Sequence, residues 1–440
     1  MEVATGTINT VLGQRAGLLD LVLKLLPPQD LKAAVLVCRM WREVGEQASY
    51  WTWVVLNVTR ENMASLCEVL AWRRRARVGV LEVQEYLLGE QLKQMEPIFA
   101  SMCEGVSSFK KLHISNTNLS TLDPVLMAGA VGRLEELWMD GTTLNLQHAT
   151  MVMTALCEED SRLKIMDISY NDLSEVEPSI LAQAVNGLEE VDLNTTKLTV
   201  EEVEAIVNCI AQRDSKLKKL NISNAGICMC HWGDIKVRFT QPPDLLASTM
   251  NKLEEVEMAY NSLSTKQLEA ILSAIGQKKS NLKKLNISCN NLSSVDPLLL
   301  VRAVSRLEEI NMDGTELTLM QARGIMLSIG FDKLSTLQKL SDNDLSKVKP
   351  DLLAKAVKRL EEVDMTNSQL TLEQMEAILK QSLVSTYLKS IFMTEPLDGN
   401  WSCDEQLIEK ARTPIEGVYI HKTDWLLDDI RRSEIEENQD

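Results

Sequence analysis

The sequence of 440 residues predicts an α/β repeat fold, a horseshoe-like solenoid with parallel strands on its concave side and helices on its convex side. The main observation is an L-x-x-L-x-L frame, seen for example at Leu188, Leu217 and Leu282. Frames begin mostly 25 or 29 residues apart. At such a period, one strand and one helix form a repeat that buries its apolar face only by stacking on its neighbours. Because 45% of residues are hydrophobic and only 4% aromatic, we expect an aliphatic core.

The strand frames run through most of the chain. The clear frames start at Phe109, Leu134, Leu163, Leu188, Leu217, Leu253, Leu282, Leu307, Leu337 and Leu360. Weaker frames start at Trp53, Val78, Leu388 and Ile415. Together they predict about fourteen stacked repeats over residues 54–420. The frame at Leu337 lacks two residues before the next polar position, so we expect its strand to be distorted.

A helix is predicted after each strand, and two kinds of start signal alternate. The longer repeats place a hydroxyl residue three positions before Glu or Gln, which is the spacing of a capping box. These pairs are Thr199 with Glu202, Ser264 with Gln267, Thr318 with Gln321, and Thr371 with Gln374. The shorter repeats place an acid before proline, as at Asp123, Glu177 and Asp296. We expect these carboxylates to accept hydrogen bonds from first-turn N–H groups.

A polar column follows the strands, at the ninth position of the frame and at the seventh in the shortened frame of Leu337. It holds Thr117, Thr142, Asn171, Thr196, Asn261, Asn290, Thr315 and Asn343. We expect these side chains to hydrogen-bond the backbone of the turns. The frame, the period and the helix lengths resemble leucine-rich repeats of the ribonuclease-inhibitor type.

Charge alternates from repeat to repeat at the third position of the frame. This position reads Lys111, Glu136, Ile165, Glu190, Lys219, Glu255, Lys284, Glu309, Lys339 and Glu362. One interpretation is a charged recognition surface. We favour the other, a ladder of opposite charges between neighbouring strands that presents little net field.

Recognition is therefore expected where repeats differ from one another. Aromatic or histidine side chains replace Asn, Asp or Ser at or near strand ends in five repeats. We predict these as substrate-binding residues: His113, Trp138, Tyr170, Tyr260 and Phe392. Trp138 and Tyr170 belong to adjacent repeats and are candidates for one contact patch. The alternative is that single exposed aromatics have no binding role.

An insert of about eleven residues separates the frames at Leu217 and Leu253. Its sequence near 228–238 includes Cys228, Cys230 and His231. Three clustered ligands without a second pair are weak evidence for zinc, so no metal site is predicted. A protruding loop and retained non-coding sequence both remain open.

Residues 18–53 do not follow the repeat. Apolar residues crowd a first predicted helix that stops at Pro27-Pro28, and a second predicted helix begins near Asp30. The L-P-P-x-D-L turn, the V-C-R-x-W core and the later Trp51 resemble an F-box. The whole chain then resembles F-box/leucine-rich-repeat proteins. That resemblance implies a Skp-type adaptor as partner, within a cullin–RING (SCF) ubiquitin ligase, and a protein substrate bound by the repeats.

The resemblance also implies which residues face the adaptor. They are Leu19, Val22, Leu23, Leu26, Pro27, Leu31, Val37, Cys38 and Trp41. One departure is that Arg15-Ala16 stands where the family usually has Leu-Pro, which puts the strength of adaptor binding in question. The alternative is that residues 18–53 form only a helical cap for the first repeat.

Composition bounds the remaining possibilities. The net charge of −17 argues against nucleic-acid binding. Nine scattered cysteines, with neither a leader nor a long apolar run, favour a cytoplasmic and possibly nuclear protein that binds no membrane. The basic run at 73–77 is either an import signal or a solvated helix end.

No catalytic constellation and no cofactor site emerge, so we expect a non-catalytic protein. We predict a flexible start at 1–17 and an acidic end at 421–440. The rival functions are a repeat scaffold or inhibitor, an extracellular receptor and an enzyme.

Overall fold

A computed structural model describes residues 55–58, 80–83, 92–93, 95–104, 109–212, 215–224, 242–331, 337–385, 387–395, 411 and 417–421. The helical segment predicted at 18–53, the insert near 228–238 and all but the first residue of the acidic end at 421–440 lie outside these residues. The chain divides into two compact units, Met1–Thr196 and Lys197–Asp440. We call them the N-terminal and the C-terminal unit.

The N-terminal unit alternates strands and helices in chain order. Its strands are β1 (Val55–Val58), β2 (Val80–Val83), β3 (Lys111–Ile114), β4 (Glu136–Trp138), β5 (Ile165–Asp167) and β6 (Glu190–Asp192). Its helices are α8 (Glu96–Cys103), the short 3-10 helix η1 (Leu119–Thr121), α9 (Pro124–Val131), α10 (Leu146–Leu156) and α11 (Pro178–Gly187). Each strand pairs in parallel with the next one along the chain.

The C-terminal unit continues the same alternation. Its strands are β7 (Lys219–Asn221), β8 (Glu255–Glu257), β9 (Lys284–Asn286), β10 (Glu309–Asn311), β11 (Leu337–Lys339), β12 (Glu362–Met365), β13 (Ser390–Thr394) and β14 (Gly417–His421). Its helices are α12 (Val200–Ala211), α13 (Pro243–Met250), α14 (Thr265–Ile275), α15 (Pro297–Val304), α16 (Leu319–Phe331), α17 (Pro350–Val357) and α18 (Leu372–Ser382). These strands also pair in parallel and in sequence order.

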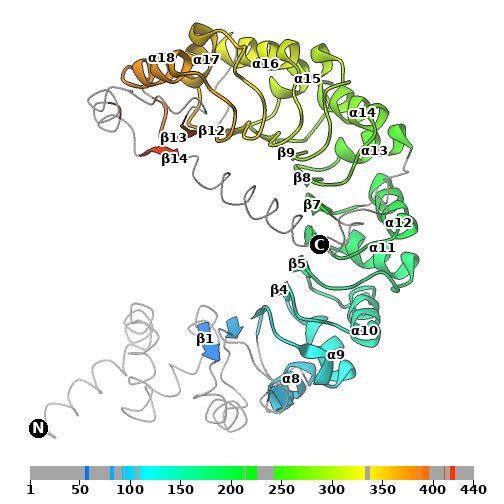
Figure 1. Cartoon of the computed structure of the whole chain (residues 1–440). Helices are drawn as coiled ribbons and strands as arrows, with labels where there is room; N and C mark the ends of the chain where they lie inside the picture. The colour runs from blue at the N-terminus through cyan, green and yellow to red at the C-terminus, as the bar shows by residue number, and fades with distance from the viewer. Residues whose placement is uncertain are drawn as a thin grey trace, which may run out of the picture. The chain divides into compact units, whose positions relative to one another are not determined.

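The predicted α/β repeat is therefore confirmed, including the weaker frames at both ends. Leu56 pairs with Leu81 in β1 and β2, and Ile391 pairs with Val418 in β13 and β14. In each unit the described helices lie on one face of the strands (Figure 1). None of the helices in the described part of the chain is long and apolar enough to cross a membrane.

The two faces of each strand differ because side chains alternate along it. The fourth and sixth positions of the frame point under the helices, where Leu137, Leu193 and Ile287 are fully buried. Each such aliphatic side chain contributes roughly 1.5–3 kcal/mol when it leaves water. The third and fifth positions point away from the helices and stay partly exposed. The outward side chains of neighbouring strands form the strand face.

The polar column at the ninth position behaves as predicted. Asn290 is 1% exposed, and its Nδ2 donates to the carbonyl oxygens of Met258 (2.9 Å), Ile287 (3.1 Å) and Ser288 (3.2 Å). Its Oδ1 accepts from Leu263 N at 3.0 Å. Since Met258 and Leu263 belong to the preceding repeat, the buried amide joins two repeats. Asn171 and Asn343 make corresponding bonds, and the threonines of the column donate within their own turns.

Most helix starts also match their predictions. The boxes of Thr199 with Glu202, Ser264 with Gln267, and Thr371 with Gln374 are complete. Thr318 and Gln321 exchange the same two bonds, at 2.8 and 3.4 Å.

The acidic starts of the short repeats agree with the prediction at two of three positions. Asp123 accepts from Val125 N and Asp296 accepts from Leu298 N, each at 2.8 Å. Glu177 is a correction, because its side chain makes no cap bond and accepts instead from Ser179 Oγ at 2.5 Å. Its extra methylene carries the carboxylate past the backbone N–H groups to that hydroxyl.

The frame at Leu337 needs a second correction. Leu337 pairs with Glu309 and Glu362, so it occupies the third position rather than the first. Counting back two residues puts Ser335 at the first position, and the steps to Leu307 and Leu360 then become 28 and 25 residues. Asn343 consequently lies in the polar column, 2% exposed. The strand keeps its pairing on both sides, so the distortion predicted for it is not found in β11.

Candidate functional site

The third-position charges on the strand face form the ladder that the sequence favours. In the N-terminal unit, Lys111 pairs with Glu136 at 2.7 Å. In the C-terminal unit, Lys284 lies between Glu255 at 3.2 Å and Glu309 at 3.1 Å. In each pair, a lysine on one strand neutralises a glutamate on the neighbouring strand. Little net charge is therefore left to attract a ligand.

A second ladder runs beside the first at the preceding position of the frame. Lys283 pairs with Glu254 at 2.6 Å, and Lys110 pairs with Glu135 at 2.6 Å. The hydrogen bond from Lys283 lowers the pKa of Glu254, and the same bond raises the pKa of Lys283. These pairs are exposed to solvent, so they add little to the stability of the fold.

The ladder ends at β11. The corrected register puts Leu337, not Lys339, between Glu309 and Glu362. Lys339 moves to the fifth position, where it pairs in register with Asn311 and Asp364. The alternation of charge predicted for this repeat is therefore wrong, and Glu362 lacks the lysine that its predecessors have.

The fifth position of the frame has a structural role in most repeats. Its Asn or Asp side chain accepts a hydrogen bond from the N–H group two residues later, at the seventh position, which closes an Asx turn. Asn286 accepts from Ser288 N at 3.1 Å, and Asn311 accepts from Asp313 N at 2.9 Å. An Asn or Asp at this position is thus explained by the turn itself.

Several repeats place another residue at the fifth position. They are the repeats of Glu82, His113, Trp138, Glu257, Lys339, Phe392 and Tyr419. Downstream of Glu257, Ala259 N donates to Ser223 Oγ of the preceding repeat at 3.1 Å. Downstream of Lys339, Ser341 N donates to Asp313 Oδ1 of the preceding repeat at 2.9 Å. In these two turns, a side chain of the preceding repeat accepts the hydrogen bond that an Asn or Asp at the fifth position accepts elsewhere. Glu257 and Lys339 are therefore not needed to close their turns.

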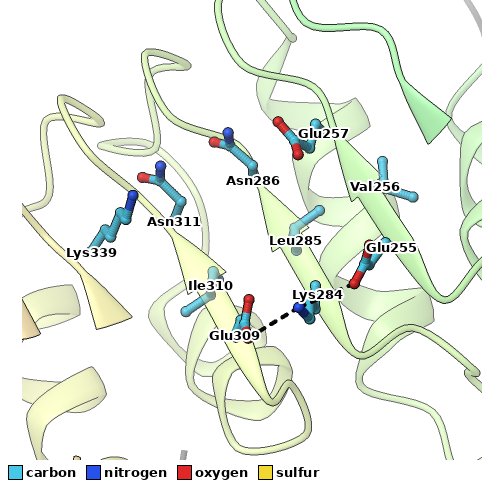
Figure 2. Close-up of a pocket in the computed structure, with 10 residues that line it drawn as sticks. All are labelled: Glu255, Val256, Glu257, Lys284, Leu285, Asn286, Glu309, Ile310, Asn311 and Lys339. Atoms are coloured by element: carbon cyan, nitrogen blue, oxygen red, sulfur yellow. Dashed lines mark ion pairs between the residues drawn. The ribbon is translucent and has the colours of Figure 1, made fainter. Parts of the chain in front are cut away.

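A shallow hollow of about 280 Å³ lies on the strand face over β8–β11. Figure 2 shows Glu257, Asn286, Asn311 and Lys339 along it, with Lys284 held between two glutamates to one side. Val256, Leu285 and Ile310 lie beneath as buried core residues. The hollow therefore has a polar rim and an aliphatic floor that already belongs to the core.

The predicted aromatic residues fall into separate groups. The rings of His113 and Trp138 meet with centroids 5.7 Å apart, while Tyr170 is 62% exposed at the end of the next strand. Among the described residues, the ring of Trp138 contacts that of His113. The shared contact patch of Trp138 and Tyr170 stays a prediction.

The aromatics of the C-terminal unit include one residue that the sequence did not single out. Phe392 stacks on Tyr419 with centroids 4.7 Å apart and an interplanar angle of 8°. Tyr260 is 52% exposed and makes a hydrogen bond with Cys289, which raises its pKa to about 12.

Tyr170 and Tyr260 share an unusual backbone position. Both have left-handed φ angles, 56° and 59°, at the eighth position of the frame. Gly141 and Gly314 stand at the same position of other repeats with φ near 60°. The turn requires this conformation whatever the side chain, so the two tyrosines depart from the residue types the turn prefers.

The described residues hold no group of three metal-ligating side chains. Burial raises the pKa of the thiols of Cys103, Cys157 and Cys209, which makes them poor nucleophiles. The predicted adaptor-binding residues from Leu19 to Trp41 lie outside the described residues.

Four outward fifth-position residues were missed by the sequence prediction, namely Glu82, Glu257, Lys339 and Tyr419. The signal for Glu257 was present, since Glu stands where Asn or Asp closes the turn in other repeats. Lys339 was missed because its frame was placed two residues late, and Tyr419 because its frame is weak.

The family model described as Leucine Rich Repeat matches residues 281–302, the repeat that contains β9 and most of α15. A solved structure, the leucine-rich repeat-containing protein LegL7 from Legionella pneumophila, is 13% identical with a TM-score of 0.41. The comparison covers 71% of this chain and 91% of that chain. No curated protein matches the sequence. With the family match on one repeat and the stacked strand–helix pairs on both sides of it, the chain contains leucine-rich repeats.

Proposed function

We propose that this chain is the non-catalytic substrate-recognition subunit of an SCF (cullin–RING) ubiquitin ligase. In this proposal the N-terminal segment binds the Skp-type adaptor and the strand face of the repeats binds a protein substrate. The observation that supports substrate binding is the set of outward residues at the fifth position that are not the Asn or Asp that closes the turn in other repeats. The L-P-P-x-D-L and V-C-R-x-W motifs directly before the repeats support the adaptor half.

The proposed mechanism is proximity. One end of the chain holds the ligase scaffold and the other holds the substrate, which raises the effective concentration of substrate lysines near the ubiquitin-charged enzyme. This role asks for exposed, rigidly placed side chains on the strand face.

Co-purification of the full chain with a Skp-type adaptor tests this proposal. The wild type should bind, while Leu26→Asp and Trp41→Ala should each lower binding at least tenfold, because each removes apolar surface from a buried contact. The matched controls are Leu298→Asp and Tyr387→Ala, at positions 63% and 53% exposed within the repeats. Both controls should bind like the wild type.

Absence of binding by the wild type, or equal binding by all variants, would exclude the ligase role. A repeat scaffold or inhibitor with a helical N-terminal cap would then be the better description. Unfolding midpoints of the four variants show whether any loss of binding comes from loss of the fold.

A further inference from the structure

The strand face loses its charge balance at β12. Glu362 has Leu337 on one side and Ser390 on the other at the third position of neighbouring strands. Neither neighbour is a cation, in contrast to Glu255 and Glu309, which both contact Lys284. The adjacent Glu361 is satisfied by Lys389 at 2.9 Å. Glu362 is thus an outward carboxylate whose ladder partner is missing.

Asp364 adds a second carboxylate on the same strand and the same face. Residues two apart on a strand lie about 6.6–6.8 Å from each other along it. One oxygen of Asp364 accepts from Thr366 N at 2.9 Å and from Thr366 Oγ1 at 2.6 Å. Within the described residues, the other oxygen has no hydrogen-bond partner.

Two stacked rings stand beside these carboxylates. Phe392 pairs in register with Asp364, and Tyr419 pairs in register with Phe392. A Cβ atom at Gly417 would overlap the ring of Tyr419, so that ring lies over the third position of β14, where there is no side chain. The Tyr419 side chain is 48% exposed. The rings are therefore tilted toward the row in which Glu362 stands.

The cation nearest in register is Lys339, which pairs with Asp364 from the other side. Burial raises the pKa of Asp313, and the charge of Lys339 opposes that rise without reversing it. Lys339 is thus shared between two carboxylates, and it stands at the fifth position rather than beside Glu362. Among the described residues, the carboxylates around β12 therefore outnumber the cations that face them.

We propose that Glu362, Asp364, Phe392 and Tyr419 form a binding site for an arginine side chain of a protein partner, carried on an extended segment. The proposal rests on the function proposed above and names the chemistry of the substrate segment. Guanidinium is planar and delocalised, so it stacks on an aromatic face and donates to carboxylates at the same time. An ammonium group provides a point charge without the planar fork. An acidic segment would meet the excess of carboxylates and is disfavoured.

The first experiment selects a displayed library of random twelve-residue peptides against the full chain. Arginine should be enriched at one position. The selected peptide is then synthesised with that arginine changed to lysine, to citrulline and to glutamate. Citrulline keeps the shape and removes the charge. Binding should weaken in the order arginine, lysine, citrulline, glutamate.

Variants of the chain then assign the site. Glu362→Gln should weaken the arginine peptide about tenfold, the size expected for one charge-assisted hydrogen bond. Tyr419→Ala should weaken it about two- to fivefold, as expected for an exposed cation–π contact. Leu337→Lys restores the missing ladder cation beside Glu362 and should weaken binding by a similar factor to Glu362→Gln. Glu361→Gln is the matched control, because it removes the same charge one residue away from a carboxylate already paired with Lys389.

The inference is overturned if arginine is not enriched, or if Glu361→Gln weakens binding as much as Glu362→Gln, which would indicate general charge attraction. The same preparations are tested for adaptor binding. Adaptor binding without arginine selectivity overturns this site and leaves the ligase role standing. Arginine selectivity without adaptor binding supports this site and overturns the ligase role.

Discussion

The region of strands β8–β10 and the region of strands β11–β14 have the same kinds of side chain on the side that faces the helices. They differ in the side chains of the strand face. Toward the helices, both regions carry aliphatic side chains and a buried Asn, Asn290 in one and Asn343 in the other. On the strand face, Lys284 is paired with glutamates on both sides, whereas Leu337 leaves Glu362 without a cation. Phe392 and Tyr419 then replace the Asx residues of the regular repeats.

This difference separates what builds the repeat from what is available for recognition. A buried amide that serves two repeats costs several hydrogen bonds when it is lost, so it is retained in both regions. An outward ion pair contributes at most about 1 kcal/mol, so it can be exchanged for another side chain without loss of the fold. The strand face is where this chain has room to vary.

The largest effect is expected from the layer that the two regions share. Asn290→Ala and Asn343→Ala should each destabilise the chain by about 2–4 kcal/mol, because each leaves buried backbone groups of two repeats unsatisfied. Urea unfolding followed by circular dichroism measures this loss. Glu257→Ala, at an exposed outward position, is the control and should change stability by less than about 0.5 kcal/mol. If Asn343→Ala lowers the free energy of unfolding far less than Asn290→Ala does, the buried asparagines do not have equivalent roles in the two regions.

A smaller effect should distinguish the two strand faces. Lys284→Met leaves Glu255 and Glu309 without their shared cation and should cost about 0.5–1 kcal/mol at low salt. Lys339→Met, in the broken region, should cost less than half as much. Repeating the unfolding in about 1 M salt should remove most of the difference, since the Debye length falls to about 3 Å. Equal costs for the two variants at low salt would contradict the contrast between the regions.

The smallest effect concerns pH. The pKa of Glu254 is lowered by Lys283, so this pair stabilises the fold above the unfolded-state pKa of glutamate. That contribution disappears as the pH falls through the lower folded-state pKa. Carboxyl chemical shifts measured by NMR across the acid range should show the pKa of Glu254 rising in Lys283→Met. A Glu254 pKa that does not move would show that the pair does not persist in solution.

The layer facing the helices was predictable from the sequence because it obeys one rule in every repeat. Leucine at fixed spacing, Asn or Thr in the turn, and a capping box such as Thr199 with Glu202 each have a single physical reason. The acid before proline was predictable only in part, since Glu177 differs from Asp123 by one methylene and bonds Ser179 instead.

The residues of the strand face were harder to predict because packing in the core does not constrain their side chains. Leu337 resembles the first residue of a frame, and only its pairing with Glu309 and Glu362 shows that it is the third. That offset hid both the position of Lys339 and the lack of a ladder cation on the strands beside Glu362. The stack of Phe392 on Tyr419 depends on Gly417 having no side chain, which no periodic pattern indicates. The adaptor-facing residues predicted from the F-box resemblance remain predictions.

The polar residue in the third helical position of the long repeats has a consequence for how the array assembles. Gln321 donates to the carbonyl oxygens of Leu292 and Val295, and Gln374 donates to those of Leu345 and Val348. Each glutamine thus belongs to a long repeat and bonds the loop of the short repeat before it. If one repeat were skipped during folding, so that a repeat packed on the next but one, these amides would face the wrong loops. Lysines at the third position would then stand beside lysines on the neighbouring strand. Skipping two repeats would restore both patterns. Misassembled or recombined forms of this array should therefore differ from the native one by even numbers of repeats.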